Sequence, residues 1–140
     1  MKRKNLTFLA ILAAGFYGYA QNSLTVNVSN LATKKGQVEI GLFNTEKNFL
    51  KSGAQYLIKK VAVNGNKVSH TFKNLPQGNY AVAVYHDANH NNKCDLNMIG
   101  MPVEGYGFSR NFRPKLSAPK FDQTKVYVAD SKSIDIQLIN

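Results

Sequence analysis

Apolar and polar residues alternate along most of the chain from residue 23 onward. In SLTVNVSN, for example, Leu24, Val26 and Val28 share one face, and the polar residues between them share the other. A period of two is typical of β-strands that bury one face. The alternation predicts about seven short strands, at residues 23–30, 36–44, 56–63, 67–72, 79–87, 125–130 and 133–139.

Turn-forming residues separate these strands. The segment Asn64-Gly65-Asn66 lies between two alternating stretches and predicts a β-hairpin, because Asn and Gly both tolerate positive φ. Gly36, the LPQG segment ending at Gly78 and residues 130–132 predict further turns. Residues 45–55 predict a short helix or an irregular crossover, and we expect no helix elsewhere.

Short strands with turn signals between them predict an all-β fold, a β-sandwich of immunoglobulin-like or transthyretin-like type. A small β-barrel is the alternative architecture. The inner faces of both sheets should then form the core. Expected core residues are Val26, Val28, Val38, Ile40, Leu42, Phe72, Tyr80, Val82, Val84, Ile134, Ile136 and Leu138.

Residues 1–20 have the pattern of a secretory signal peptide. Three basic residues precede the apolar run LTFLAILAAGFYGYA, and Gly18 and Ala20 stand at the −3 and −1 positions of a cleavage site before Gln21. The run is shorter than the roughly 20 residues that span a bilayer, so we expect cleavage and no transmembrane anchor. Residues 21–140 would form a single β-sandwich domain that is periplasmic or secreted.

The chain is basic, with 18 Lys and Arg against 8 Asp and Glu. Without residues 1–20 the balance is 15 − 8, or +7. The basic residues are scattered rather than gathered in a stripe, so we expect no nucleic-acid partner. A solvated basic surface is the simplest reading, although acidic polysaccharide or lipid head groups would suit this charge.

Cys94 is the single cysteine, so no intrachain disulfide is possible. An exported domain without crosslinks must depend on its hydrophobic core for stability. Three roles are open for the thiol of Cys94: a reactive group, an intermolecular link, or a loop residue without a function.

The segment HDANHNNKCDLNMIGMPVEGYGFS covers residues 86–109 and follows LPQGNYAVAVY. Together they resemble a family of exported bacterial proteins of uncharacterised function, whose members carry H-D-x-N-x-N-x-x-x-D-x-N-x-x-G-x-P-x-E-G-Y-G-F-S. The resemblance implies a periplasmic or secreted β-sandwich and implies no activity. Many relatives have Gly where this chain has Asn92, and Asn also accepts a left-handed conformation.

The residues of this segment also predict a calcium site. Asp or Asn stands at positions 1, 3, 5 and 9 of a loop, and Ca²⁺ takes six to eight oxygen ligands from such loops. Met98 occupies position 12, where a bidentate Glu is expected, so a later acid would have to fold back. The alternative is a purely structural loop, because Asn and Asp also cap turns. The candidate ligands are Asp87, Asn89, Asn91, the carbonyl of Lys93, Asp95 and Glu104.

Two other chemistries use neighbouring residues. His86, His90 and Cys94 are four residues apart, which brings ligands together only in a helix, so copper or zinc is disfavoured. A small periplasmic enzyme that uses Asp87, Glu104 and His86 is the alternative function. No nucleophile with a base and an orienting group can be assembled from known motifs, so we expect a protein that is not an enzyme.

Residues 104–122 form a long connection in which aromatic residues alternate with Arg and Lys. Such a mixture would suit a sugar, a peptide or an anionic polymer. Alternatively, Tyr106, Phe108, Phe112 and Phe121 pin the connection to the sandwich, which is the simpler expectation. The sequence therefore predicts an exported binding module with a calcium loop, or a loop built like one, that contacts an unidentified ligand or envelope component.

Overall fold

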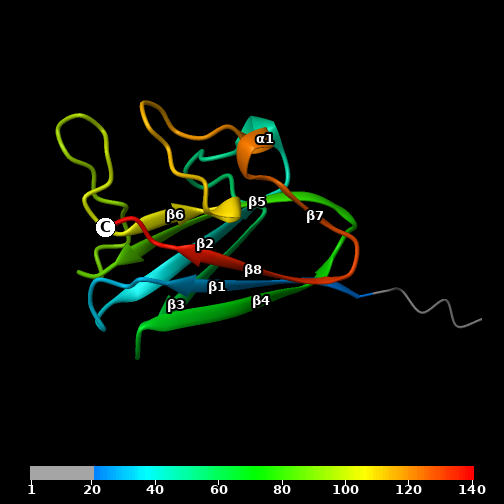
Figure 1. The fold of residues 1–140 in the computed structure, drawn as a ribbon, viewed down its shortest axis with the longest axis horizontal. Coiled ribbons are helices and arrows are strands. Elements are labelled where there is room, and N and C mark those ends of the chain that lie inside the picture. Colours follow the sequence, from blue (N-terminus) through cyan, green and yellow to red (C-terminus); the bar gives the residue numbers. More distant parts are fainter. Residues whose placement is uncertain (1–20) are drawn as a thin grey trace, which may run out of the picture.

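The computed structural model describes residues 21–140, so the predicted signal peptide lies outside the described residues. Two β-sheets pack face to face, with strand orders β4-β1-β8 and β3-β2-β5-β6 (Figure 1). The short strand β7 pairs with β5 at the end of the second sheet. The strands are β1 (Asn22–Ser29), β2 (Gln37–Phe43), β3 (Leu57–Ala62), β4 (Lys67–Leu75), β5 (Gly78–Asp87), β6 (Tyr106–Phe108), β7 (Val126–Val128) and β8 (Ser131–Gln137).

The three-stranded sheet is built around β1. This strand pairs antiparallel with β4 and parallel with β8, and its residues alternate between buried and half-buried. Leu24, Val26 and Val28 are fully buried on the inner side, as the alternation predicts. On the outer side Thr25 hydrogen-bonds across to Thr71 with an oxygen–oxygen distance of 2.8 Å.

The inner face of the five-stranded sheet supplies the other half of one core cluster. Val38, Ile40 and Leu42 of β2 are fully buried, and Val82 and Val84 of β5 lie beside them. All predicted core residues are buried except Ile134, which is half-buried and packs against the cluster. The predicted all-β sandwich is therefore confirmed, with eight strands instead of about seven.

The predicted hairpin at Asn64-Gly65-Asn66 is wrong. β3 pairs with β2 and β4 pairs with β1, so this turn joins two different sheets. None of the three turn residues adopts positive φ, which the tight hairpin turns require. The turns at Gly36 and Gly78 likewise carry the chain from one sheet to the other.

The helical content also differs from expectation. Residues 45–55 contain a single 3-10 turn, η1 (Glu46–Asn48), within an irregular crossover. Two short helical turns that the sequence did not predict follow later, η2 (Ser109–Asn111) and α1 (Phe121–Thr124). Strand β6 was also missed, because three residues are too few to show a period.

Three long connections lie on the outer side of the five-stranded sheet, away from β4, β1 and β8 (Figure 1). They are residues 44–56, residues 88–105 and residues 109–125, and the last two form the upper loops of the view. A second, smaller apolar cluster anchors two of them at one end of the sheet. Phe49 and Phe121 pack there edge to face, over Phe43 and Ala81.

Candidate functional site

The Asp/Asn loop (residues 87–95) begins at the last residue of β5. The Asp87 side chain is fully buried, and its carboxylate accepts hydrogen bonds from Gln37 Nε2 and from the backbone N–H groups of Asn91 and Asn92, all at 3.0 Å. Burial alone would raise the pKa of Asp87, but these donors outweigh it and hold the pKa below its ordinary value. Asp87 is therefore an ionised anchor for the loop.

Asn side chains shape the rest of the loop. Asn89 Oδ1 accepts from the backbone N–H of Asn91, and Asn91 Oδ1 accepts from that of Lys93, so each closes a local turn. Their amide groups donate to the Asp95 carboxylate at 2.7–3.0 Å. Asn92 has a φ of 60°, so the turn keeps the left-handed residue that was expected at this position.

Glu104 returns to the loop, as its proposed role requires. Its two carboxylate oxygens accept from the backbone N–H groups of Ala88, at 3.2 Å, and Asp95, at 3.4 Å. The next residue, Gly105, accepts at its carbonyl from the backbone N–H of His86 at 2.7 Å. Glu104 thereby fastens both ends of the connection to the end of β5.

A calcium ion would find oxygen donors in this loop but no ready cage. Asp87, Asp95 and Glu104 keep unused lone pairs, and amide and carbonyl oxygens surround them. In the described part of the chain, however, no group of three or more His, Cys, Asp or Glu side chains is placed to hold a metal ion. The donor chemistry fits Ca²⁺, while the positions of the three carboxylates would have to close around it.

The residues of the other two candidate sites, the copper or zinc site and the catalytic site, do not form a common site in the structure. His86 is buried at the end of the inner face, where its Nε2 donates to the carbonyl of Lys35 at 2.7 Å. His90 is exposed, and Cys94 is half-buried on the opposite side of the sheet. None of His86, Asp87 and Glu104 lines either of the two principal cavities, and all three side chains bind backbone groups. This geometry does not favour the catalytic alternative.

A groove lies on the outer face of the five-stranded sheet, and we call it the outer groove. Its volume is about 820 Å³. The smallest side chains of the face form its floor, since Gly41 of β2 lies directly opposite Ala83 of β5, which pairs with Phe108 of β6. The small apolar cluster around Phe43 closes one end. The floor is low because two adjacent positions on neighbouring strands have almost no side chain, although Gln55 of the first connection packs over Gly41.

The walls of the outer groove come from the three long connections. Residues 50–55, 92–102 and 114–119 each contribute side chains. Of the eleven large apolar side chains exposed in residues 21–140, five line this groove, which is more than scattered exposure would give. These five are Leu50, Leu96, Ile99, Met101 and Leu116.

The outer groove also has polar side chains in its lining, namely Glu39, Lys51, Ser52, Gln55, Tyr85, Asn92, Lys93, Tyr106, Lys115 and Ser117. Glu39 Oε2 accepts from the Tyr85 hydroxyl at 3.0 Å and lies 3.8 Å from Lys60 Nζ. Burial raises the pKa of Tyr85, and the bond to Glu39 raises it further. Burial, with the carboxylates of Glu104, Asp95 and Glu39 nearby, raises the pKa of Cys94 to about 11. The thiol is therefore protonated at neutral pH and is not an activated nucleophile.

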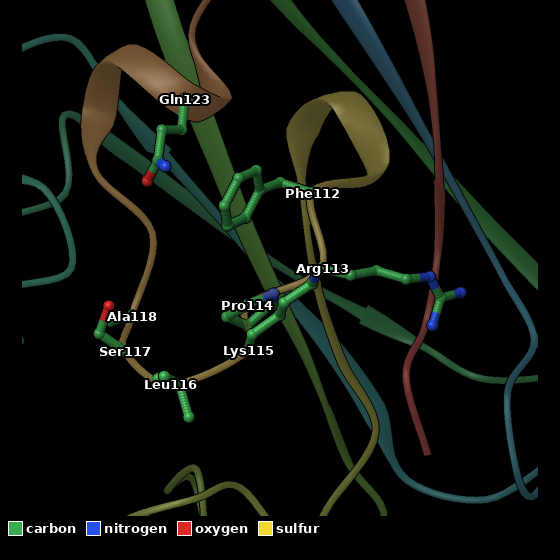
Figure 2. A pocket seen from close by; sticks show the side chains of 8 residues that line it. All are labelled: Phe112, Arg113, Pro114, Lys115, Leu116, Ser117, Ala118 and Gln123. Carbon is green, nitrogen blue, oxygen red and sulfur yellow. The ribbon is translucent and has the colours of Figure 1, made fainter.

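A smaller cavity of about 340 Å³ lies between α1 and residues 112–118. Figure 2 shows the Phe112 ring between Gln123 and Pro114, while Arg113 extends in the opposite direction and Leu116 points away from the ring. The aromatic residues of the connection thus have different surroundings. Phe121 packs in the small apolar cluster and anchors the connection to the sandwich, as expected. Phe112 lines the smaller cavity, whereas Tyr106 and Phe108 line the outer groove.

The alternation of the strands does not reveal the outer groove, because it is assembled from three separate connections. One sequence signal was present, since Ile99 and Met101 interrupt an otherwise polar loop without following any period. A second was the pair of small outward positions, Gly41 and Ala83, within strands that are otherwise rich in large residues.

Residues 26–137 match the family described as "Uncharacterized protein conserved in bacteria (DUF2141)". The chain belongs to this family, as the resemblance of the central segment indicated. No curated protein and no solved structure matches the chain. Among the described residues, no helix has the length and apolar character needed to cross a membrane.

Proposed function

We propose that this chain is an exported, non-enzymatic binding module, and that its ligand site is the outer groove. The signal-peptide pattern of residues 1–20 supports export to the periplasm or beyond. The absence of an activated nucleophile at the outer groove supports binding rather than catalysis, because Cys94 is protonated there and Tyr85 is bonded to Glu39.

The observation that carries the proposal is a largely apolar hollow on the outer face of the sheet. Small-molecule sites are typically concave, mostly apolar and about 300–1,000 Å³ in volume, with few polar groups. The outer groove has about 820 Å³ and leaves large apolar side chains in water at its rim. Burying those side chains against an apolar ligand would supply the binding energy.

A neutral, environment-sensitive dye, N-phenyl-1-naphthylamine, tests the groove without prejudging the natural ligand. We expect the folded protein to enhance its fluorescence and Ala83→Leu, which fills the floor, to remove most of that enhancement. Ile99→Ala should weaken dye binding about three- to tenfold by removing apolar contact area.

Met98→Ala is the matched control, because Met98 neighbours Ile99 on the same loop and is fully exposed, but does not line the groove. Circular dichroism would establish that each variant is folded. Dye binding that is unchanged by both Ala83→Leu and Ile99→Ala would overturn the proposal.

A second proposal concerns the Asp/Asn loop, and the ionised, buried Asp87 favours it. Three acids of this segment, Asp87, Asp95 and Glu104, have no Lys or Arg ion-pair partner within residues 21–140. We propose that Ca²⁺ binds here weakly, in the micromolar-to-millimolar range of extracellular modules, by drawing Asp95 and Glu104 towards Asp87.

Thermal unfolding of metal-depleted protein tests the calcium site. Calcium at ten times its Kd would stabilise the fold by about 1.4 kcal/mol, which corresponds to a rise of roughly 3–6 °C in Tm. Asp95→Asn should abolish the rise, whereas Asp122→Asn, at an exposed surface pair, should keep it. A Tm that does not move in 10 mM calcium rules the site out.

A further inference from the structure

The rim of the outer groove carries three lysines, one from each connection that forms its walls. Lys51, Lys93 and Lys115 all line the groove and are exposed. Within residues 21–140, no carboxylate oxygen lies within 4 Å of their Nζ atoms. Glu39 is the single acid of the lining, so the lining has a net charge of 3 − 1, or +2.

We propose that the outer groove binds a straight-chain fatty acid, with its acyl chain along the apolar floor and its carboxylate at the basic rim that the lysines form. The inference rests on the proposed function of the groove and names its ligand class. Charge complementarity selects the head group, because Glu39 is already bonded to Tyr85 and lies near Lys60, which leaves the lysines of the rim uncompensated.

The floor of the outer groove favours an acyl chain over a sugar or a peptide. Gly41, Ala83 and Phe108 present no side-chain hydrogen-bonding group. Beside them, Gln55 packs over Gly41 and Tyr85 is already bonded to Glu39, so a sugar would exchange its hydration for few hydrogen-bond partners. An extended peptide gains affinity from free backbone groups at a sheet edge. Here the floor is the face of β5, whose backbone pairs with β2 on one side and with β6 and β7 on the other. An acyl chain requires none of these bonds.

Calorimetric titration at low ionic strength with three twelve-carbon probes tests the proposal. The probes are dodecanoate, dodecanol and dodecyltrimethylammonium, each below the concentration at which it aggregates. We expect dodecanoate to bind at least about tenfold more tightly than the cationic probe, because the head-group charge is reversed at the lysines. Decanoate should bind about tenfold more weakly than dodecanoate, since two fewer methylenes are buried.

Substitution of the rim tests the head-group contact. K51Q/K93Q/K115Q should weaken dodecanoate binding about three- to tenfold, in line with exposed charge pairs, and should leave dodecanol binding unchanged. K34Q/K67Q/K132Q is the matched control, because it removes the same charge from exposed lysines outside the groove and should have less than about a twofold effect.

Cys94 provides a reporter within the site. It lines the outer groove, and it is the single cysteine of the chain, so bound dodecanoate should slow its reaction with a maleimide. In the variant C94S/M98C the thiol lies outside the groove, and the same ligand should not slow its reaction.

The outcomes separate the ligand class from the groove itself. Equal binding of all three probes, sensitive to Ile99→Ala, would overturn the anionic head group while the groove stands. Binding of the naphthylamine dye without binding of any twelve-carbon probe would overturn the fatty acid and keep the proposed function. Failure of the dye and the probes together would overturn both.

Discussion

The inner and outer faces of the five-stranded sheet come from alternate residues of the same strands, yet one face is filled and the other is hollow. On β2, Val38, Ile40 and Leu42 enter the core, whereas Gly41 between them contributes to the floor of the outer groove. On β5, Val84 faces the core next to the small, outward-facing Ala83. The alternation determines which face is apolar, and side-chain volume determines which face can receive a ligand.

The largest expected difference between the faces is in stability. Ile40→Ala should lower the free energy of unfolding by about 2–5 kcal/mol, because it leaves a cavity in a fully buried cluster. Leu116→Ala removes a side chain of similar size at the rim of the outer groove. It should change the free energy of unfolding by less than about 0.5 kcal/mol. Urea unfolding measures both values, and a similar loss for the two variants would contradict this account of the faces.

Two glycines of the sheet extend the comparison to added volume. A Cβ at Gly107 would lie 2.7 Å from Ile136 Cγ2 in the core. Gly107→Ala should therefore overpack the core and lower the free energy of unfolding by about 1–3 kcal/mol. A Cβ at Gly41 would lie 3.2 Å from Gln55 Cγ, a flexible side chain on the outer face. Gly41→Ala should therefore be within about 0.5 kcal/mol of neutral in the same urea assay. A larger cost for Gly41→Ala than for Gly107→Ala would reverse the assignment of the faces.

The smallest of the three effects concerns the end of β5, where the inner face meets the Asp/Asn loop. Asp87→Asn should lower the free energy of unfolding by about 1–2 kcal/mol at pH 7, because the amide N–H₂ group of Asn would face the donors that now bind the carboxylate. The pKa of Asp87 is lowered in the folded state, so the unfolded chain takes up the proton at higher pH. The stabilisation is complete above the ordinary carboxyl pKa, near 4, and is lost as pH falls through the lowered value.

Unfolding free energies from pH 7 to pH 2 would check this sign. The difference between wild type and Asp87→Asn should shrink as the pH falls below about 4. Asp122→Asn, at an exposed pair with Lys125, should stay parallel to wild type. A constant gap between wild type and Asp87→Asn over the whole range would show that the carboxylate is not the stabilising species.

The strands and most of the core could be predicted from the sequence because burial follows a strict period of two. The pairing of the strands could not be predicted. Alternation shows which residues of a strand are buried, but it does not show to which of the two sheets the strand belongs. Asn64-Gly65 is a strong hairpin signal, yet the chain crosses to the other sheet there without positive φ. Tertiary packing of β4 against β1, 46 residues apart at Thr25 and Thr71, overrides the local turn preference.

The Asp/Asn loop was predictable in position and in its left-handed turn, since Asn92 could replace Gly at little cost. The return of Glu104 could also be anticipated, because Gly and Pro set the path between them. The outer groove could not be predicted as a site, although Ile99, Met101 and the small pair Gly41 and Ala83 contribute to it. It depends on where three connections meet in space, and that arrangement leaves no periodic trace in the sequence.

The parallel pairing of β1 with β8 has a consequence for the order of folding. Ser23 lies beside Ser131, 108 positions later in the chain, and β4 on the other side of β1 is also distant in sequence. β1, the central strand of the smaller sheet, can therefore pair with both of its neighbours only when residues from almost the whole polypeptide are in place. Such long-range closure predicts slow folding, on the millisecond-to-second scale of proteins with high contact order.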